Sequence, residues 1–307
     1  MSVRKSVVPA AGLGTRFWPA TMALPKEMLP LVDRPVMEYG LDELRGAGLN
    51  DVLVVTSRAK RVLEDHFDLP PDVAAQAAAR GVREPAAGLQ LHFRRQDRPR
   101  GLGHAVLLAE EHVGGEPFAV LLPDDVLAGP PNCMDEMARL HRETGRPVLA
   151  VRRVPRSLVS AYGVVALGGR PVGPVHEVAD LVEKPTPEEA PSDLAIVGRY
   201  VLPPQIFALL RDQVPGAGGE IQLTDALRRL HRDWPFLAYE FPGRVFDTGS
   251  KLGFLQATVE LAAAHPEFGP GFRAYLAGFA CPRRPEPRPR PVGAGPARFA
   301  RAAPERI

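Results

Sequence analysis

A glycine turn flanked by cations is the first feature of this sequence that could do chemistry. The apolar run at 8–10 leads into a Gly-Leu-Gly turn at 12–14, Arg16 follows, and Lys26 stands ten residues later. The backbone N–H groups of such a turn can approach phosphate oxygens, and an arginine can hold a phosphate through two parallel hydrogen bonds. The segment therefore predicts a phosphate-binding site, and its two spaced cations suit a triphosphate.

The turn matches neither of two common nucleotide-binding motifs. It lacks the third glycine of a dinucleotide fingerprint, and it lacks the Gly-Lys-Ser/Thr ending of a P-loop. A Gly-x-Gly turn after a strand is often an ordinary tight turn. Lys26 favours the functional interpretation, because it lies between Pro25 and Pro30 in a rigid stretch of backbone where a merely solvated lysine is seldom found.

Carboxylates follow two of the strand-like segments. Asp124 comes after the apolar run 118–122, so it stands at the carboxyl end of a strand, where open α/β folds bind their ligands. Hard oxygen ligands of this kind suit Mg²⁺. A loop aspartate is also common as a turn or cap residue, so the residues alone leave both interpretations open. Asp247, which follows the strand-like Val245, is the candidate for a second carboxylate.

Strand-like and helix-like segments alternate over the first 125 residues. Apolar, β-branched runs predict buried strands at 6–10, 51–56, 90–93 and 118–122. Helical patterns lie between them at 36–47 and 103–111, and Asp33-Arg34-Pro35 predicts a cap and a proline at the first helical position. The alternation predicts a mostly parallel, three-layer α/β unit whose strand ends position the turn and Asp124.

The pattern changes in the second half of the chain. Strands with less helix between them are predicted at 148–152, 163–166, 177–183 and 195–202. Helices are predicted to follow at 220–230, 251–264 and 271–279. The chain after Cys281 is dense in proline and arginine and has almost no aliphatic residues, so we expect 282–307 to be a disordered tail.

Composition bounds the class of protein. The 307 residues are 45% hydrophobic, which is enough to bury a full core, and a formal charge of +2 gives no reason to expect a nucleic-acid partner. The two cysteines, Cys133 and Cys281, lie far apart, which disfavours a disulfide scaffold or a zinc site and predicts a reducing, cytoplasmic location. The apolar run before Gly12 is too short for a signal peptide or a bilayer span, so no membrane partner is expected.

Many blocks of the sequence, matching in order and spacing, together resemble one family. They lie at 12–21, 25–33, Gln96, 101–105, 122–125, 162–165, 182–185, 195–200, 220–225 and 246–249. In these blocks the chain is similar to the bacterial UTP–glucose-1-phosphate uridylyltransferases, also called UDP-glucose pyrophosphorylases, which are sugar nucleotidyltransferases. The resemblance covers roughly residues 4 to 280.

The resemblance implies UTP and glucose 1-phosphate as substrates and Mg²⁺ as cofactor. It assigns nucleotide binding to Ala11, Gly12, Gly14, Thr15, Gln96 and Gly101, sugar binding to Gly163, Glu183 and Gly198, joint metal binding to Asp124 and Asp247, and catalysis to Arg16, Lys26 and Lys184. Gln96 suits its role because an amide offers both a donor and an acceptor to a pyrimidine edge.

The implied reaction is an in-line displacement without a covalent intermediate. Arg16 and Lys26 would stabilise charge on the transferred and leaving phosphates, while Lys184 would orient the attacking sugar phosphate. That phosphate is already ionised, so no general base is required. His104 is accordingly expected to be a structural group at a helix start.

The resemblance also implies an architecture and an assembly. The expected fold is a three-layer, Rossmann-like nucleotidyltransferase fold with a mixed, mostly parallel central sheet. The expected domain spans 1–281, with a nucleotide-binding half at about 1–125, a sugar-binding half at about 126–250 and C-terminal helices at about 251–281. A homodimer or homotetramer is implied.

One departure keeps alternatives open. Met22 stands where family members usually carry a lysine, so a cation is missing near the phosphate loop. If that lysine contacts pyrophosphate, turnover falls; if it faces solvent, nothing changes. Two alternatives are a glucose-1-phosphate thymidylyltransferase that uses dTTP, whose base shares the edge that Gln96 would read, and a non-catalytic regulatory paralogue.

Overall fold

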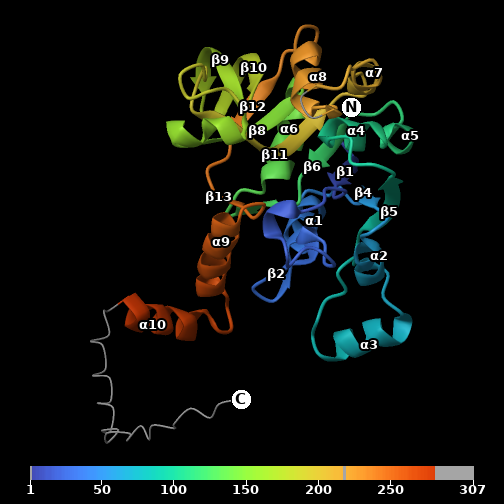
Figure 1. The fold of residues 1–307 in the computed structure, drawn as a ribbon, viewed down its shortest axis with the longest axis vertical. Helices are drawn as coiled ribbons and strands as arrows, with labels where there is room; N and C mark the ends of the chain where they lie inside the picture. The colour runs from blue at the N-terminus through green and yellow to red at the C-terminus, as the bar shows by residue number, and fades with distance from the viewer. Residues whose placement is uncertain (1, 217–218, 281–307) are drawn as a thin grey trace, which may run out of the picture. The chain divides into compact units, whose positions relative to one another are not determined.

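A nine-stranded mixed sheet runs through the first of two units, residues 1–260 (Figure 1). The computed structural model describes residues 2–216 and 219–280. In sheet order the strands are β5 (Gln90–Gln96), β4 (Asp51–Ser57), β1 (Lys5–Pro9), β6 (Phe118–Leu121), β11 (Leu194–Leu202), β8 (Val148–Arg153), β12 (Leu237–Glu240), β10 (Val175–Glu183) and β9 (Gly163–Val172).

The direction of strand pairing changes in the middle of this sheet. Strands β5, β4, β1 and β6 pair in parallel, and β12 pairs in parallel with β8. Strand β11 is antiparallel to β6, β8 and β9, and β10 is antiparallel to β12 and β9. The mixed sheet is confirmed, but "mostly parallel" describes only its first half. Beyond it, β9 and β10 are joined by a two-residue turn at 173–174, which permits only antiparallel pairing.

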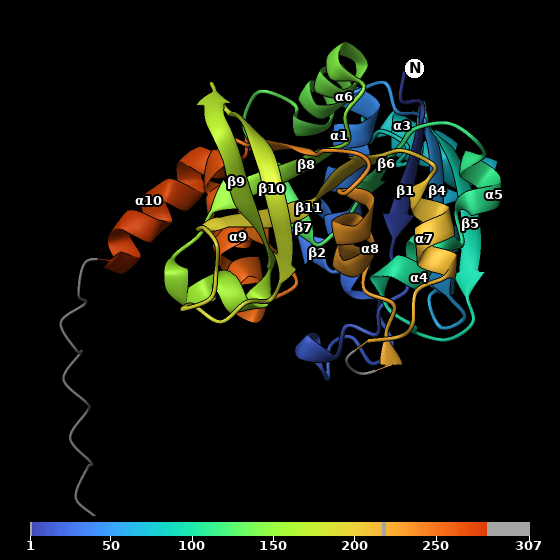
Figure 2. The ribbon, with the colours of Figure 1, turned by 90° about the horizontal axis from the view of Figure 1, so that it is seen from above.

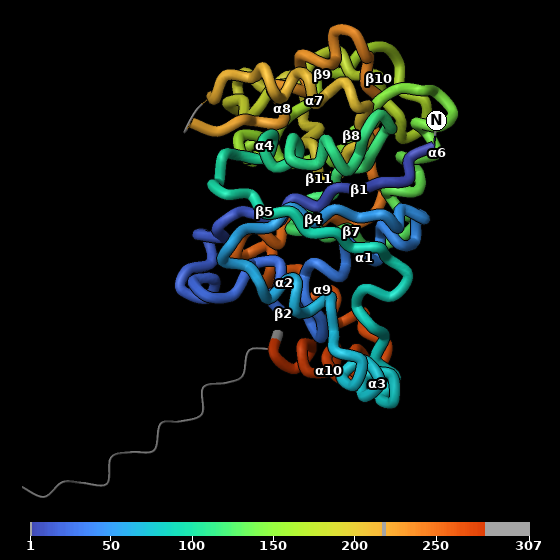
Figure 3. Tube along the Cα trace, turned by 90° about the vertical axis from the view of Figure 1, so that its right-hand side faces the viewer, coloured from blue at the N-terminus to red at the C-terminus, as the bar shows by residue number. Residues whose placement is uncertain are grey.

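Helices cover both faces of this sheet (Figures 2 and 3). Helices α4 (Leu102–Leu107), α7 (Ile206–Arg211) and α8 (Leu223–Leu230) pack together on one face, and α1 (Val36–Gly46) packs with α6 (Cys133–Thr144) on the other. Successive residues of β1 enter different cores: Val7 packs with the first group and Val8 with the second, and both are fully buried. A strand buried on both sides reads as a continuous apolar run, which explains why this layering was predictable.

The remaining elements are short, apart from two C-terminal helices. They are η1 (Thr15–Phe17), η2 (Lys26–Met28), β2 (Pro30–Leu31), β3 (Arg34–Pro35), α2 (Arg61–Phe67), α3 (Pro71–Ala79), α5 (Glu110–Val113), β7 (Asp125–Ala128), η3 (Arg156–Ala161), β13 (Arg244–Asp247), α9 (Lys251–Ala264) and α10 (Gly269–Ala280). The described part of the second unit, 261–280, holds the end of α9 and all of α10. Across the described residues, no helix combines the length and the apolar character needed to cross a membrane.

Several element boundaries differ from the predictions. The helix expected at 103–111 is divided into α4 and α5. The helix expected at 220–230 begins only at Leu223, because residues 220–222 run alongside the loop at 100–103, where Ile221 N donates to Arg100 O at 2.8 Å. The cap predicted from Asp33-Arg34-Pro35 is wrong: Pro35 itself is the N-cap residue of α1, since residues 34–35 form strand β3. The predicted tail, 282–307, lies outside the described residues.

Candidate active site

The glycine turn after β1 is fixed by hydrogen bonds to its own backbone. Gly14 has a φ of 65°, a left-handed conformation that glycine adopts without strain. Its carbonyl accepts hydrogen bonds from Phe17 N at 3.0 Å and from Thr21 Oγ1 at 2.7 Å. The chain then enters η1, which carries the exposed Arg16. Met22, just beyond, is 71% exposed, so the position of the missing lysine faces solvent.

Lys26, in η2, reaches the carboxyl end of β6. Its ammonium donates a hydrogen bond to Asp124 Oδ2. Burial by itself would lower the pKa of Lys26 and raise that of Asp124, but the attraction between the two groups outweighs it, so the pKa of Lys26 is raised and that of Asp124 is lowered. Arg16 also helps to lower the pKa of Asp124. Both partners are therefore charged at neutral pH.

A second lysine, Lys60, is buried in the protein interior near Lys26. Lys60, 5% exposed, donates to Glu27 Oε2 at 2.7 Å and to Ala10 O at 2.6 Å. Burial lowers the pKa of Lys60, although Glu27 opposes the shift. Because Ala10 begins the glycine turn and Glu27 follows Lys26, this buried pair ties the phosphate loop to η2. Nothing in the spacing of the sequence had singled out Lys60.

A cleft of about 470 Å³ opens between these segments. It lies at the carboxyl ends of β1, β5 and β6, the edge at which α/β sheets bind ligands. Eight of the predicted site residues line it: Ala11, Gly12, Gly14, Thr15, Lys26, Gln96, Gly101 and Asp124. The structure thus brings together all six residues predicted to bind the nucleotide, one predicted catalytic cation and one predicted metal ligand.

The side-chain amide of Gln96 is oriented by two neighbours. Its Nε2 lies 3.4 Å from Gly101 O and 2.7 Å from His104 Nδ1. A carbonyl oxygen can only accept, so the NH₂ end faces Gly101, and His104 then accepts through Nδ1. Burial, followed by the charge of Arg100, lowers the pKa of His104, which keeps the imidazole neutral as this role requires. His104 lies at the start of α4, where it was expected, but its contact with Gln96 was not foreseen, and its structural role stays a prediction.

Gly101 allows the loop at 100–103 to pass close to residues 220 and 221. Its φ is 94°, and a Cβ here would lie 2.7 Å from Ile221 O and 2.9 Å from Glu220 Cβ. Only glycine fits both the conformation and the space. The sequence block at 220–225, which has no obvious chemistry of its own, therefore forms a support for the loop that carries Gln96.

Asp124 and Asp247 converge although they lie far apart in the sequence. Strand β7 pairs with β13 in a register that sets Asp125 opposite Asp247, and Asp124 O accepts from Thr248 N at 2.8 Å. A Cβ on Gly249 would lie 2.9 Å from Asp124 Oδ2 and 3.0 Å from Asp247 Oδ1. Both carboxylates therefore border one small space that glycine leaves open, an all-oxygen donor set that fits Mg²⁺.

Asp125, next to Asp124, points to a different partner. Its Oδ2 accepts from Gly198 N at 2.9 Å. Burial and the neighbouring Asp124 raise the pKa of Asp125 to about 6. A Cβ on Gly198 would lie only 2.4 Å from Leu122 Cβ, so this glycine serves the packing of β11 against the end of β6. The predicted contact of Gly198 with the sugar stays a prediction.

The other residues predicted to bind the sugar phosphate form a separate group. Gly163 lies opposite Glu183 in the β9–β10 pair, and a Cβ on Gly163 would lie 3.3 Å from Glu183 Oε2. Lys184 Nζ is 3.3 Å from Glu183 Oε1. The backbone of Lys184 has a φ of 46°, which is rare and strained for a residue with a side chain. Strain of this kind gathers at functional sites, which supports the role predicted for this lysine.

A buried arginine fixes the loop that carries the aspartates. Arg199, with a fully buried side chain, donates to Leu122 O at 2.9 Å and to Asp125 O at 2.7 Å, and it pairs with Glu43 at 2.8 Å. The pair links β11 and the Asp124 loop to α1. Sequence reasoning missed both Arg199 and Glu43, since an isolated Arg and an isolated Glu carry no signal until the fold joins them.

The chain is similar in sequence to characterised protein families along most of its length. A family model described as Nucleotidyl transferase matches residues 5–264. A UTP–glucose-1-phosphate uridylyltransferase 1 of Streptococcus pyogenes is 45% identical over 284 residues, which cover 89% of this chain and 93% of that protein.

Solved structures give the same result. A crystal structure of UDP-glucose pyrophosphorylase complexed with UDP-glucose matches with a TM-score of 0.80 and 39% identity, over 86% of this chain and 100% of that one. A UTP-bound UGPase from Acinetobacter baumannii matches with a TM-score of 0.81 and 37% identity, over 90% of this chain and 99% of that one.

Proposed function

The chain belongs to the nucleotidyl transferase family and, within it, to the UTP–glucose-1-phosphate uridylyltransferases, and from this premise we propose that it transfers UMP from UTP to glucose 1-phosphate. The products are UDP-glucose and pyrophosphate. The observation that carries the proposal is the cleft itself, which places the glycine turn, Lys26, Gln96 and Asp124 around one space. A phosphate-binding turn and a base-reading amide in one cleft are what a nucleoside triphosphate requires.

The chemistry is a problem of charge. The phosphate of glucose 1-phosphate attacks the α-phosphorus of UTP, and both reactants are anions that repel each other. Lys26, held charged by Asp124, and Arg16, on the exposed side of the turn, stabilise the charge on the transferred and leaving phosphates. Lys184 orients the attacking phosphate from the β10 end, and Glu183 binds glucose hydroxyls.

Nucleotide recognition rests on the fixed amide of Gln96. Because its NH₂ end is turned to Gly101 and His104, its carbonyl oxygen is the end left to accept a hydrogen bond from the base. Uracil carries an N–H donor on its pairing edge. This arrangement suits uracil and thymine alike, since they share that edge.

Mg²⁺ is the cofactor we propose, held by Asp124 and Asp247. The two carboxylates border a common space over Gly249, and oxygen ligands are those that Mg²⁺ prefers. When bound, the ion would supply neutralisation of phosphate charge. Lys26 donates to the same Asp124 carboxylate that borders this space. The position of Lys26 near the reacting phosphates therefore depends on that carboxylate.

Steady-state pyrophosphate release from the purified chain tests the proposal. We expect turnover with UTP, glucose 1-phosphate and Mg²⁺, and a preference for UTP over dTTP in kcat/KM. Uracil and thymine differ by one methyl group, worth ~1 kcal/mol in a loose pocket, so the preference can be as small as about fivefold. A clear preference for dTTP would replace the proposal with a thymidylyltransferase.

The alternative of a regulatory paralogue makes a different prediction in the same assay. It expects no turnover in the native chain and recovery of turnover in Met22→Lys. The solvent exposure of Met22 disfavours it. A cytoplasmic location, a homodimeric or homotetrameric assembly and the division into nucleotide- and sugar-binding halves stay predictions.

A further inference from the structure

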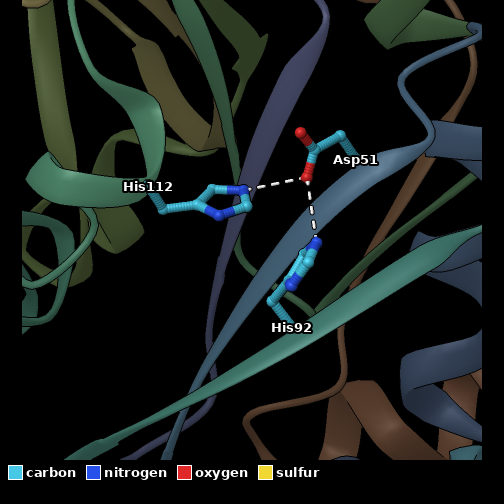
Figure 4. Close-up of side chains that lie close together, drawn as sticks. All are labelled: Asp51, His92 and His112. Carbon is cyan, nitrogen blue, oxygen red and sulfur yellow. Dashed lines mark ion pairs between the residues drawn. The ribbon is translucent and has the colours of Figure 1, made fainter.

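Asp51, His92 and His112 meet at the amino end of β4, at the opposite end of the strands from the cleft (Figure 4). They come from β4, from the neighbouring β5 and from α5. His112 Nε2 lies 2.9 Å from Asp51 Oδ1, and His92 Nε2 lies 3.5 Å from the same oxygen. All three possible ligand atoms lie within 4.8 Å of one another. Among the residues that the structure describes, no other group of His, Cys, Asp or Glu meets this test.

Two of the polar atoms in this cluster are buried and face each other in a poorly directed contact. Asp51 Oδ1 and His112 Nε2 are both buried, and neither has a well-directed hydrogen bond to the described protein, despite their separation of 2.9 Å. The two atoms form an ion pair, so each is the partner of the other, but a poorly directed contact satisfies a buried polar atom only in part, and an unsatisfied one costs about 1–3 kcal/mol. Two such atoms that face each other point to a ligand that both can bind.

The donor set identifies the class of that ligand. Two imidazole nitrogens and one carboxylate oxygen are the ligands of Zn²⁺ and related transition-metal ions, whereas Mg²⁺ and Ca²⁺ prefer oxygen alone. The two imidazole rings are tilted by 54° with their centres 4.9 Å apart, so they do not stack against each other. The His92 side chain is 52% exposed, which leaves a route for an ion and a position for water.

The charges around the cluster are compatible with a bound cation. Lys5 is the nearby cation, but its ammonium donates to His112 O at 2.8 Å and to Val113 O at 3.3 Å rather than to Asp51. Lys5 therefore does not occupy the carboxylate of Asp51, and its charge is expected to moderate the affinity.

We propose that Asp51, His92 and His112 form a binding site for one transition-metal ion of the Zn²⁺ class. Strand β4 separates this site from the nucleotide cleft by about 20 Å, at about 3.3 Å per residue. The ion would link α5 to β4 and β5, which pair with each other along this edge, and would so stabilise the outer edge of the parallel half. The proposal does not depend on the proposed catalytic function.

Isothermal titration calorimetry of the chelator-treated full chain with Zn²⁺, in excess Mg²⁺, tests the site. We expect one ion per chain in the native protein, and affinity reduced at least ~10-fold in His92→Asn and in Asp51→Asn, since each loses one ligand. His66→Asn is the matched control: His66 Nε2 lies 2.8 Å from Glu38 Oε1 in a similar pair that has no third ligand, so its loss should leave Zn²⁺ affinity unchanged.

A second readout separates ligand loss from misfolding. Zn²⁺ should raise the melting temperature of the native protein and of His66→Asn, but not that of His92→Asn. Because the His92 side chain is exposed, we expect the His92→Asn variant to fold normally. Co²⁺ absorption should show nitrogen coordination that His112→Asn removes. Absence of Zn²⁺ binding in the native protein, or native affinity in His92→Asn, would overturn the proposal.

Discussion

The two ends of the parallel strands offer different ligands. At the carboxyl ends, Lys26 pairs with Asp124, and Asp124 and Asp247 supply only oxygen donors. At the amino ends, Asp51 meets two imidazoles. One sheet therefore separates a proposed site for phosphate and a hard cation from a proposed site for a softer cation. The residues beside a carboxylate, more than the carboxylate itself, therefore decide which ion it suits.

Removal of the aspartates at the carboxyl ends should have the largest effect. Asp124→Ala and Asp247→Ala should each reduce turnover at least ~100-fold, because each removes part of the proposed metal site. Pyrophosphate release measures this. Asp51→Asn at the amino end should leave turnover within about twofold, and a comparable loss in that variant would abolish the distinction between the two ends.

The buried pair behind the cleft should contribute strongly to stability. Lys60→Met leaves Glu27 buried without its cation, and we expect the free energy of unfolding to fall by about 3–5 kcal/mol. Urea denaturation followed by circular dichroism measures the loss. The double variant Lys60→Met/Glu27→Gln, which removes both charges, should recover most of it. An unstable double variant would mean that packing, not the unpaired charge, is responsible.

The contact of His104 with Gln96 should have a smaller effect, confined to nucleotide binding. His104→Ala removes one hydrogen bond that orients the amide, and we expect KM for UTP to rise about fivefold with kcat nearly unchanged. His141→Ala is the control, since both histidines are 6% exposed but His141 bonds to Arg146 O. A change in kcat alone would refute the orienting role.

Replacement of the exposed methionine should have the smallest effect. Met22→Lys introduces the cation that the family resemblance leads us to expect at this position, but the side chain faces solvent, so we expect turnover and KM for UTP to stay within about twofold. Initial rates at several UTP concentrations measure both. An increase of tenfold or more would show that position 22 reaches the pyrophosphate during the reaction.

Local sequence predicted the parts of the fold and of the site that are contiguous. The run into β1 was recognisable because both of its faces are buried, and the turn at 12–14 was recognisable because glycine and arginine recur there in a short stretch. The antiparallel half was harder, since strand direction depends on connections such as the short turn between β9 and β10. Helix α6 was not predicted at all.

Pairings between distant residues were out of reach of sequence reasoning. Lys60 and Glu27 are 33 positions apart, and Arg199 and Glu43 are 156 apart. Each is an unremarkable charge until the fold buries it beside its partner. The packing of Leu122 explains why position 198 has no side chain, and the predicted contact of Gly198 with the sugar stays a prediction.

The chemistry that this chain carries could be read from local patterns of residue type, because a phosphate turn, its cations and its family blocks are each contiguous. Which groups act together depends on the tertiary structure. The β7–β13 register brings Asp124 to Asp247, and the β4–β5–α5 junction brings Asp51 to two histidines. Distances across a sheet depend on strand order and register, which are set by the packing of the whole core and leave no local trace in the sequence.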